Sequence, residues 1–295
     1  MKPSPFAYHR PGSLDEALRI LNEVGDEGKV LAGGQSLVPL LNMRVAVPGA
    51  LVDINGLAEL SDVRVESGDG RAGVHVGAAA RHAHVERDDD AYATVPLLRQ
   101  ALGSVAHPTI RNRGTTVGSL AHADPSGEMT AVLALLGGTV ELRSAASSRV
   151  VTAEEFFLGP LESCIRAGEL ATSAFFPEPD GRTGSAWLEI ARRHGDYAVC
   201  GVGALVTLDD DRRVVGARTS YISVGPTPVV AELAHTVKDQ PYDAADWAGA
   251  AAAAVTELEP EDDIHATAEY RRHLAGVLTE RALQAAARHA IDRGI

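Results

Sequence analysis

The sequence predicts an α+β protein with two domains, and three observations support this prediction. The chain has 295 residues, which is more than a single small core requires. Short apolar runs alternate with helical patterns in its first part. After the segment from Pro177 to Gly181 (PEPDG), whose prolines and glycine interrupt any regular element, long strands are followed by helices. We expect one domain over residues 1–177 and a second over residues 178–295.

The first domain is expected to begin with a small β-α-β-α-β unit over residues 1–57. Ser13 and Glu16 have the spacing of a capping box, in which the hydroxyl and the carboxylate each bind a free backbone N–H. Apolar residues then follow at helical spacing as far as Val24. The later elements of the unit are a strand over residues 30–32, a helix that opens at Ser36 and a strand over residues 50–54.

Helices and strands are mixed in the remainder of the first domain, residues 58–177. Apolar and polar residues alternate from Val74 to Ala78, which is typical of a strand. The other expected elements are helices over residues 82–87, 92–105 and 128–136, a strand over residues 139–143, and closing segments over residues 154–157 and 169–176.

The second domain is expected to contain a three-stranded antiparallel sheet and helices. Three segments read as long strands: Ser185–Arg192, Val199–Leu208 and Val214–Val224. Asp209–Arg213 has the polar composition of a turn between the last two strands. Helical patterns follow over residues 243–258 and 268–291, so this domain is assigned to the α+β class.

Charge and cysteine content disfavour several classes of function. The 27 Lys and Arg residues against 40 Asp and Glu residues give a net charge of −13, which argues against nonspecific nucleic-acid or anionic-membrane binding. Cys164 and Cys200 are too few for a four-thiolate metal site, and their low number fits a reducing cytoplasm. No signal-peptide core is seen at the N-terminus, and no apolar run reaches the roughly 18 residues of a transmembrane helix.

Two glycine-containing segments carry the strongest functional signal. Residues 30–44 (VLAGGQSLVPLLNMR) run from a strand through Gly33-Gly34 into a helix, and residues 108–132 (PTIRNRGTTVGSLAHADPSGEMTAV) run from a loop through Gly118 into a helix. Glycine lets a backbone approach a diphosphate closely, and converging N–H groups attract the anion. The pair indicates one large phosphorylated cofactor, although a plain strand–turn–helix corner explains the first segment equally well. Neither segment matches the Rossmann or P-loop pattern.

Other polar residues have simpler explanations. No HExxH pattern is present, and no metal site is expected in this chain. His82 and His84 lie on a polar helix and are expected to be solvated. Arg111 and Arg113 could pair with a phosphate or with a neighbouring carboxylate, and the structural interpretation is favoured for Arg113.

The same segments resemble those of a known family. AGGQSLVPLLNMR and IRNRGTTVGSLAHADPSGEMTAVLALLGG are similar to the flavin subunit of molybdenum hydroxylases, a family that includes the medium subunit of aerobic carbon monoxide dehydrogenase and the FAD domain of xanthine dehydrogenase. Arg192–Ala198 followed by Gly201–Ala204 resembles a third family segment. The resemblance implies a two-subdomain FAD-binding domain of the vanillyl-alcohol-oxidase (PCMH) type, with subdomains at about residues 1–57 and 58–177, and a smaller C-terminal domain.

By position, the resemblance also implies a set of FAD contacts. Those that would wrap the diphosphate are Ala32, Gly33, Gly34, Gln35, Ser36 and Leu37, and those near the diphosphate and flavin are Thr115, Thr116, Val117, Gly118 and Ser119. Glu128 stands where the family has an acidic residue, usually Asp, and Asp124 is close by. The backbone near Leu170 would meet the flavin ring, and Tyr197 would lie beside it. A tyrosine at the start of a strand is otherwise more often part of a core or rim.

Two positions depart from the family pattern. Val117 replaces the first of two glycines in T-[IV]-G-G-[SN], which would loosen one backbone approach. Leu188 stands where some relatives have a lysine near the flavin, a charge that Arg192 or Arg193 could supply instead.

The resemblance implies an oxidoreductase subunit that transfers electrons. A molybdopterin-containing large subunit would hydroxylate the substrate, and a small subunit with two [2Fe–2S] clusters would pass electrons to FAD in this chain. FAD would then reduce an acceptor such as NAD, a quinone or oxygen, with no catalytic acid or base required from this chain. A free-standing FAD-dependent oxidase or dehydrogenase with its own substrate pocket, and a nucleotide-binding scaffold without redox activity, stay as alternatives.

Overall fold

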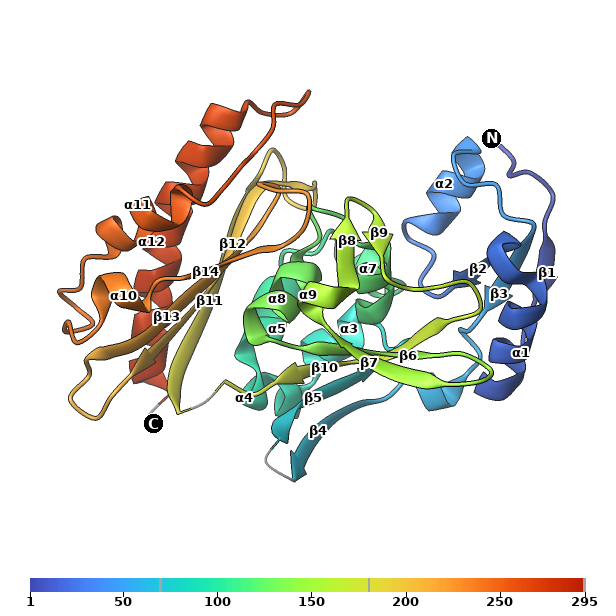
Figure 1. Cartoon of the computed structure of the whole chain (residues 1–295), viewed down its shortest axis with the longest axis horizontal. Helices are drawn as coiled ribbons and strands as arrows, with labels where there is room; N and C mark the ends of the chain where they lie inside the picture. The colour runs from blue at the N-terminus through green and yellow to red at the C-terminus, as the bar shows by residue number, and fades with distance from the viewer. Residues whose placement is uncertain (69–70, 180, 294–295) are drawn as a thin grey trace.

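The computed structural model describes residues 1–68, 71–179 and 181–293, and these ranges contain four β-sheets with helices packed against them (Figure 1). Asp180 of the expected linker lies outside the described residues. The N-terminal sheet and the C-terminal sheet occupy opposite ends of the molecule, with the five-stranded sheet between them (Figure 1).

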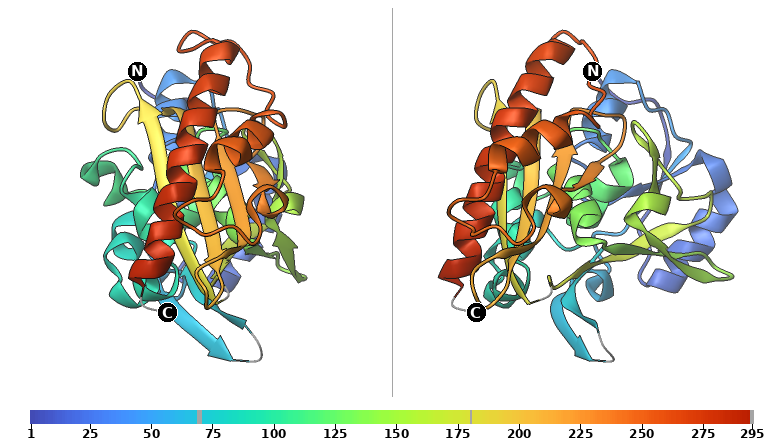
Figure 2. Two further views of the ribbon diagram at one scale, coloured as in Figure 1. Left: turned by 90° about the vertical axis from the view of Figure 1, so that its left-hand side faces the viewer. Right: turned by 60° about the vertical axis from the view of Figure 1, so that its left-hand side comes forward.

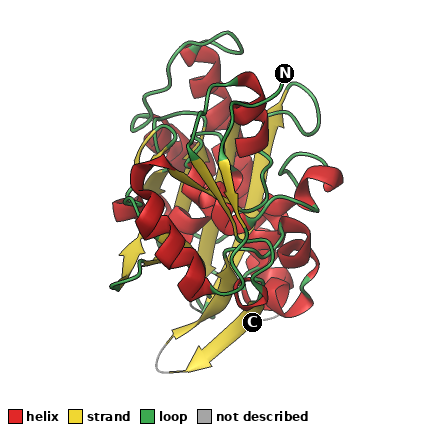
Figure 3. Ribbon diagram, turned by 90° about the vertical axis from the view of Figure 1, so that its right-hand side faces the viewer, coloured by secondary structure: helices red, strands yellow, loops and turns green. Residues whose placement is uncertain are grey.

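The N-terminal unit has the expected β-α-β-α-β order, and Figure 3 views the molecule from its side. Its elements are β1 (Ala7–His9), α1 (Leu14–Val24), the 3₁₀ turn η1 (Gly25–Glu27), β2 (Gly28–Leu31), α2 (Leu37–Met43) and β3 (Ala50–Asp53). The three strands are parallel in the order β1-β3-β2. The expected capping box is half formed. Ser13 Oγ accepts from the Glu16 N–H at 3.2 Å, but the Glu16 carboxylate accepts from the N–H of Gly12.

The five-stranded sheet is antiparallel and joins segments that are distant in sequence. Its order is β4 (Val63–Gly68), β5 (Arg71–Gly77), β10 (Leu170–Pro177), β6 (Thr139–Arg143) and β7 (Ser148–Thr152). Strand β6 returns the chain to this sheet after the helices between β5 and β6, and β10 enters last, between β5 and β6. Smaller elements nearby are η2 (Ala58–Leu60), α9 (Ala153–Phe156), β8 (Phe157–Gly159) and β9 (Glu162–Ser163).

Two expectations for the helical region were wrong. The predicted helix over residues 92–105 is two helices, α4 (Asp89–Thr94) and α5 (Pro96–Leu102), because Pro96 disfavours a helical conformation at Val95, whose φ is −130° and ψ 78°. The TTVGS motif, expected as a loop, is the start of helix α7 (Thr116–His122). The other helices here are α3 (His82–Arg87), α6 (Pro108–Arg111) and α8 (Glu128–Leu136).

The C-terminal part contains an antiparallel sheet of four strands, one more than expected. Its order is β11 (Arg182–Ala191), β12 (Ala198–Leu208), β13 (Val214–Ile222) and β14 (Val229–Glu232). The helices are α10 (Ala234–Val237), α11 (Trp247–Val255) and α12 (Ala268–Asp292). Helix α12 crosses one face of the sheet (Figure 2). A Cβ on Gly184 would lie 2.1 Å from the Ala286 carbonyl oxygen, so only glycine permits this backbone contact.

Each face of the four-stranded sheet faces a different hydrophobic core. Ala186 and Leu188 pack into the core that α11 and α12 form, whereas Trp187 belongs to the core of the first domain. Leu205 and Ile222 join Trp187 in that first core. Alternation along β11 therefore decides which residues face the first domain and which face α12.

Candidate cofactor site

The two glycine-containing segments lie against each other. A Cβ placed on Gly33 would be 2.6 Å from both the Arg113 carbonyl oxygen and the Gly114 Cα. A Cβ on Gly118 would be 3.9 Å from the Ala32 Cβ. The structure therefore brings together the two segments that the sequence separates by about eighty residues.

The first segment is a tight turn with an accessible surface. Gly34 has a φ of 73°, in the left-handed region that favours glycine. Its carbonyl accepts from the Val38 N–H at 3.0 Å, and the Gln35 side chain donates to the Gly33 carbonyl at 3.1 Å. Ala32 and the residues from Gly34 to Leu37 are partly exposed, so they can contact a ligand.

The part of the second segment that contains Gly118 is the first turn of α7, and this glycine leaves room for the N-cap side chain. Thr115 is the N-cap, and its Oγ1 accepts from the Gly118 N–H at 3.2 Å. A Cβ on Gly118 would lie 2.4 Å from that oxygen. The side chains of Thr115, Thr116 and Val117 are buried, whereas Gly118 and Ser119 are partly exposed. Gly118 and Ser119 are therefore the residues of this turn that a cofactor can reach.

The structure explains the departure at Val117 in part. Its side chain is buried in the first core rather than directed at the neighbouring segment. A valine is thus accommodated by apolar packing at a position where many relatives have glycine.

His82 is buried, not solvated as the sequence suggested. Only 4% of the residue is exposed, its N–H donates to the Gly114 carbonyl at 2.9 Å, and its Nδ1 lies 3.2 Å from Thr116 Oγ1. Burial, and then the charge of Arg111, lower the pKa of His82 to about 4. A neutral His82 imidazole therefore packs beside the second segment, in contact with Thr116.

Three arginines lie near the first segment or near residues that contact it. Arg81 donates to the Asn55 amide oxygen at 2.6 Å and to the Arg113 carbonyl. The Arg113 side chain is exposed, and it has no ion pair among the described residues. Arg10 lies near Gly56, with its Nε 3.7 Å from a Cβ placed there. The exposed charge of Arg113 would favour the diphosphate of a cofactor here, so the phosphate interpretation of Arg113 fits the geometry better than the ion-pair interpretation.

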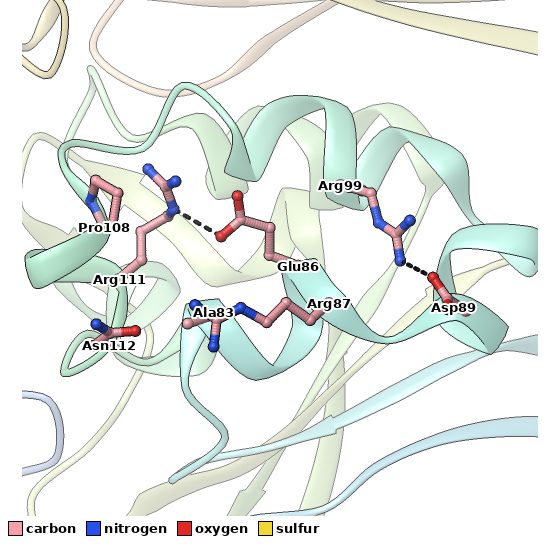
Figure 4. A pocket seen from close by; sticks show the side chains of 8 residues that line it. All are labelled: Ala83, Glu86, Arg87, Asp89, Arg99, Pro108, Arg111 and Asn112. Carbon is pink, nitrogen blue, oxygen red and sulfur yellow. Dashed lines mark hydrogen bonds and ion pairs between the residues drawn. The ribbon is translucent and has the colours of Figure 1, made fainter.

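Arg111 has a structural role instead. It is buried and pairs with Glu86 at 2.8 Å (Figure 4). It also donates to the Val105 and Ala106 carbonyls. Glu86 and Arg111 line a pocket of about 460 Å³ over α3, α5 and α6, where Arg99 also pairs with Asp89. A larger cavity of about 920 Å³ lies between the five-stranded and four-stranded sheets. Neither is lined by residues of the two glycine segments.

Acidic groups gather beyond the second segment. Burial, followed by the charges of Glu189 and Asp124, raises the pKa of Glu128 to about 8. Burial also raises the pKa of Glu189, whose carboxylate accepts from the Trp187 indole N–H at 3.0 Å. Glu128 therefore holds a proton near neutral pH, and this side of the site suits the uncharged parts of a cofactor rather than its phosphates.

The third family segment borders this acidic group. Tyr197 is 68% exposed, and Asp124 and Glu128 contribute to the rise of its pKa after partial burial. Gly195 has a φ of 86°, and a Cβ there would lie 2.5 Å from the His107 ring. The tyrosine is thus on the rim of the site, accessible to a bound ring.

The C-terminal sheet holds the Asp124 turn in place. Ser223 donates its N–H to the Pro125 carbonyl at 2.8 Å, and its hydroxyl lies 2.8 Å from Ser126 Oγ. Asp124 itself accepts from the Ser126 N–H at 2.8 Å. Both parts of the chain therefore shape the site.

The side chains of two predicted site residues, Leu170 and Leu188, lie in hydrophobic cores and not beside the acidic residues. Leu170 is buried in the first core, and its backbone starts β10 opposite Arg143. Leu188 packs on the second core, on the face of β11 that α12 covers. Its neighbour Glu189 lies on the cofactor side, so a charge at position 188 would point away from the cofactor.

The sequence reasoning missed three residues of the site: Asn55, Arg81 and Glu189. Asn55 directly follows the third predicted strand and Arg81 directly precedes a predicted helix, which are common places for polar site residues. Glu189 could have been found from strand alternation, because it shares a face with Trp187.

The residues fit a dinucleotide such as FAD. Two backbone segments converge, a left-handed glycine turn is accessible beside arginines, and an acidic, partly buried region with an exposed tyrosine adjoins them. Within the described ranges no three His, Cys, Asp or Glu side chains could hold a metal ion, and no helix is long and apolar enough to cross a membrane. Cys164 and Cys200 are both free thiols.

Comparisons with known proteins agree with this geometry. Residues 4–179 match the family model for the FAD binding domain in molybdopterin dehydrogenase, and residues 185–286 match that for the CO dehydrogenase flavoprotein C-terminal domain. The chain is 40% identical to caffeine dehydrogenase subunit beta of Pseudomonas sp. (strain CBB1), covering 97% of this chain and 96% of the relative. It is 34% identical to the carbon monoxide dehydrogenase medium chain of Afipia carboxidovorans, covering 97% and 98%.

A solved structure gives the same result. The structure of quinoline 2-oxidoreductase from Pseudomonas putida 86 contains a chain that superposes with a TM-score of 0.91 at 35% identity, covering 99% of this chain and 100% of that one. The loop geometry and these likenesses lead to one assignment: the chain belongs to the FAD-binding subunits of the molybdenum hydroxylase family.

Proposed function

We propose that this chain accepts electrons from the [2Fe–2S] clusters of a small partner subunit and passes them through FAD to a soluble or membrane-borne acceptor. The observation that carries the proposal is the contact of Gly33 with Arg113 and Gly114, which directly precede the Thr115–Ser119 turn, within a chain that matches both family models. When bound, FAD would supply a centre that exchanges electrons with both neighbours. The protein's own contribution is to bind, orient and tune it.

The first segment would hold the diphosphate. The backbone from Ala32 to Ser36 offers N–H groups beside Arg113, and Leu37 begins α2 directly afterwards. Glycine at position 34 keeps this turn in a left-handed conformation without a steric penalty.

The second segment would contact the diphosphate and the flavin. Gly118 and Ser119 are its accessible residues, and Asp124 and Glu128 follow on the side where Tyr197 is exposed. Glu128 is protonated near neutral pH and can therefore donate a hydrogen bond to a neutral acceptor atom. We also propose that the Leu170 backbone and Leu188 contact the flavin; both side chains pack in hydrophobic cores.

The partner and substrate assignments extend the proposal. A large molybdopterin-binding subunit would hydroxylate the substrate, and the acceptor would be NAD, a quinone or oxygen. The names of two relatives, caffeine dehydrogenase and quinoline 2-oxidoreductase, support an N-heteroaromatic substrate for the complex. We place the complex in the cytoplasm, which two unpaired cysteines support.

Purification of the chain alone and with its two partners tests the proposal. We expect the isolated chain to bind FAD and turn yellow, to oxidise no substrate by itself, and to support acceptor reduction when the partner subunits are added. Substrate oxidation by the isolated chain would instead indicate a free-standing flavin oxidase. A colourless chain that refuses FAD would indicate a scaffold without redox activity.

Selective removal of FAD from the assembled complex separates the steps. Turnover with the physiological acceptor should stop, while reduction of molybdenum by substrate continues. Full turnover with that acceptor in the FAD-free complex would contradict the proposed role.

A further inference from the structure

The two cofactor segments belong to different parts of the first domain, and two polar side chains join them. Asn55 follows β3 and donates its amide to the carbonyl oxygens of Ala32 at 2.8 Å and Leu31 at 3.3 Å. Arg81 precedes α3 and donates to the Asn55 amide oxygen at 2.6 Å and to the Arg113 carbonyl. A continuous chain of hydrogen bonds therefore runs from the first segment to the second.

The Asn55 end of this connection is fixed in position. Asp53 accepts from the Asn55 N–H at 2.9 Å and from its amide nitrogen at 2.5 Å. The second oxygen of Asp53 accepts from the Tyr8 hydroxyl at 2.5 Å. The Asn55 side chain thus has little freedom to turn away from the carbonyls it binds.

The Arg81 end is fixed by backbone. Arg81 and Thr115 form an antiparallel bridge. On either side of it, the His82 N–H donates to the Gly114 carbonyl at 2.9 Å and the Thr116 N–H to the Ala80 carbonyl at 3.4 Å. The guanidinium therefore starts beside the second segment and reaches Asn55, which in turn binds the first segment.

Arginine suits this position for a geometric reason. Its two terminal nitrogens donate to two different acceptors, one in each part of the domain. The planar guanidinium presents these donors in a rigid fork, whereas a lysine ammonium is a single point on a flexible stem. Both acceptors are uncharged, so the arrangement is more than neutralisation of a carboxylate.

We propose that Arg81 is a positioning residue that sets the spacing between the two FAD segments by way of Asn55. It acts on the cofactor through the protein, by holding the Ala32 carbonyl and the Arg113 carbonyl at a fixed separation. The inference depends on FAD binding in the proposed function.

Four variants of the full-length chain test it: Arg81→Lys, Arg81→Gln, Asn55→Ala and the double variant Arg81→Gln/Asn55→Ala. The readouts are the dissociation constant of FAD by fluorescence titration and the flavin absorption spectrum. Because the two side chains form one connection, each single variant should weaken binding about ten-fold, and the double variant should also weaken it about ten-fold rather than a hundred-fold. All should share the same spectral change.

Arg87→Gln is the matched control, since Arg87 is an exposed arginine at the end of α3 and should leave both readouts unchanged. Thermal unfolding of the FAD-free variants separates misfolding from loss of positioning. If Arg81→Gln does not fold, the comparison of Arg81→Lys with Asn55→Ala still decides the question.

A direct electrostatic role would give a different pattern. If Arg81→Lys bound FAD like the wild type, and if the effects of Arg81→Gln and Asn55→Ala multiplied, Arg81 would act as a charge on the phosphates and the inference would fall. Equal FAD binding by all variants would also overturn it. Failure of the wild-type chain to bind FAD would instead overturn the proposed function.

Discussion

The two glycine segments have similar sequences but are built in different ways. The turn around Gly33 is held from outside, by Asn55 and by direct backbone contact with Gly114. The segment around Gly118 is held from within, because its glycine gives room to the hydroxyl of Thr115 that caps α7. The difference shows that a glycine in such a motif can be required for packing within the chain as well as for contact with a ligand.

The electrostatic surroundings of the two glycine segments also differ. Arg10 and Arg113 are near the first segment, whereas Asp124, Glu128 and Glu189 lie beyond the second. A diphosphate is favoured at the first end and a neutral ring at the second. This difference in charge would orient a dinucleotide bound as we propose.

The largest effect is expected where backbone meets backbone. Gly33→Val would place carbon atoms inside the van der Waals radius of Arg113 and Gly114, so the two segments must separate. We expect FAD affinity to fall on the order of 100-fold and the free energy of unfolding by about 2 kcal/mol. Titration with FAD and urea unfolding measure the two losses.

Gly56→Ala is the control for this prediction, because its Cβ would meet only Arg10 at 3.7 Å, an ordinary contact. Wild-type FAD affinity in Gly33→Val would show that the two segments are not packed as described.

A second test concerns the acidic end and depends on pH. The folded-state pKa of Glu128 is raised to about 8, so the folded protein keeps a proton that the unfolded chain releases above about pH 4.5. The contribution of Glu128 to wild-type stability should therefore fall between these two pH values, and Glu128→Gln should lack this fall. We expect the variant to gain on the order of 2 kcal/mol over the wild type at pH 9 and nothing at pH 4, a figure discounted for partial exposure.

Thermal melts of the FAD-free chain across this pH range make the measurement, with the exposed Glu154→Gln as control. A constant difference between Glu128→Gln and the wild type at every pH would mean that Glu128 is ionised in the folded protein.

A smaller effect is expected within α7. Thr115→Val removes the hydroxyl that caps the helix and should lower the free energy of unfolding by about 1 kcal/mol, with a loss of FAD affinity below that of Gly33→Val. Thr115→Ser keeps the cap and should behave like the wild type. Gly118→Ala should resemble Thr115→Val, since its Cβ displaces the same hydroxyl. If Gly118→Ala lost far more affinity than Thr115→Val, then Gly118 would contact the cofactor directly.

The smallest effect is expected at the rim. Tyr197 is largely exposed, so Tyr197→Phe should change stability by less than about 0.5 kcal/mol. Tyr197→Ala should alter the flavin absorption spectrum, because it removes the whole ring and not only the hydroxyl. An unchanged spectrum in Tyr197→Ala would remove this residue from the site.

Much of the fold could be predicted because local patterns decide it. Helix α8 and strand β6 begin and end where the sequence predicted, and so does α3. Strand β14 was missed because its four residues, Val229–Glu232, are too few to show a pattern. The break at Val95 was missed although Pro96 signals it, since the helical pattern continues on both sides.

The site was harder to predict because it depends on contacts between distant residues. The family motif identified Ala32–Leu37 and Thr115–Ser119 as neighbours, and the structure joins them. No sequence pattern indicates that Asn55 and Arg81 bridge these segments, because each is an ordinary polar residue at the end of an element. His82 appeared solvated in sequence, but Gly114 and Thr116, more than thirty residues away, bury it.

The hydrogen bonds of Ser223 to the Asp124 turn limit how freely the two parts of the chain could be exchanged between relatives. The two family models divide the chain between residues 179 and 185, as though two modules could be exchanged freely. Yet the second module supplies Ser223 to the cofactor turn and Trp187 and Ile222 to the first module's interior. A chimera joined at the linker would combine a first module and a sheet face whose side chains do not match. Successful recombination should therefore conserve one face of the transferred sheet, while its opposite face, under α12, can diverge with its helix.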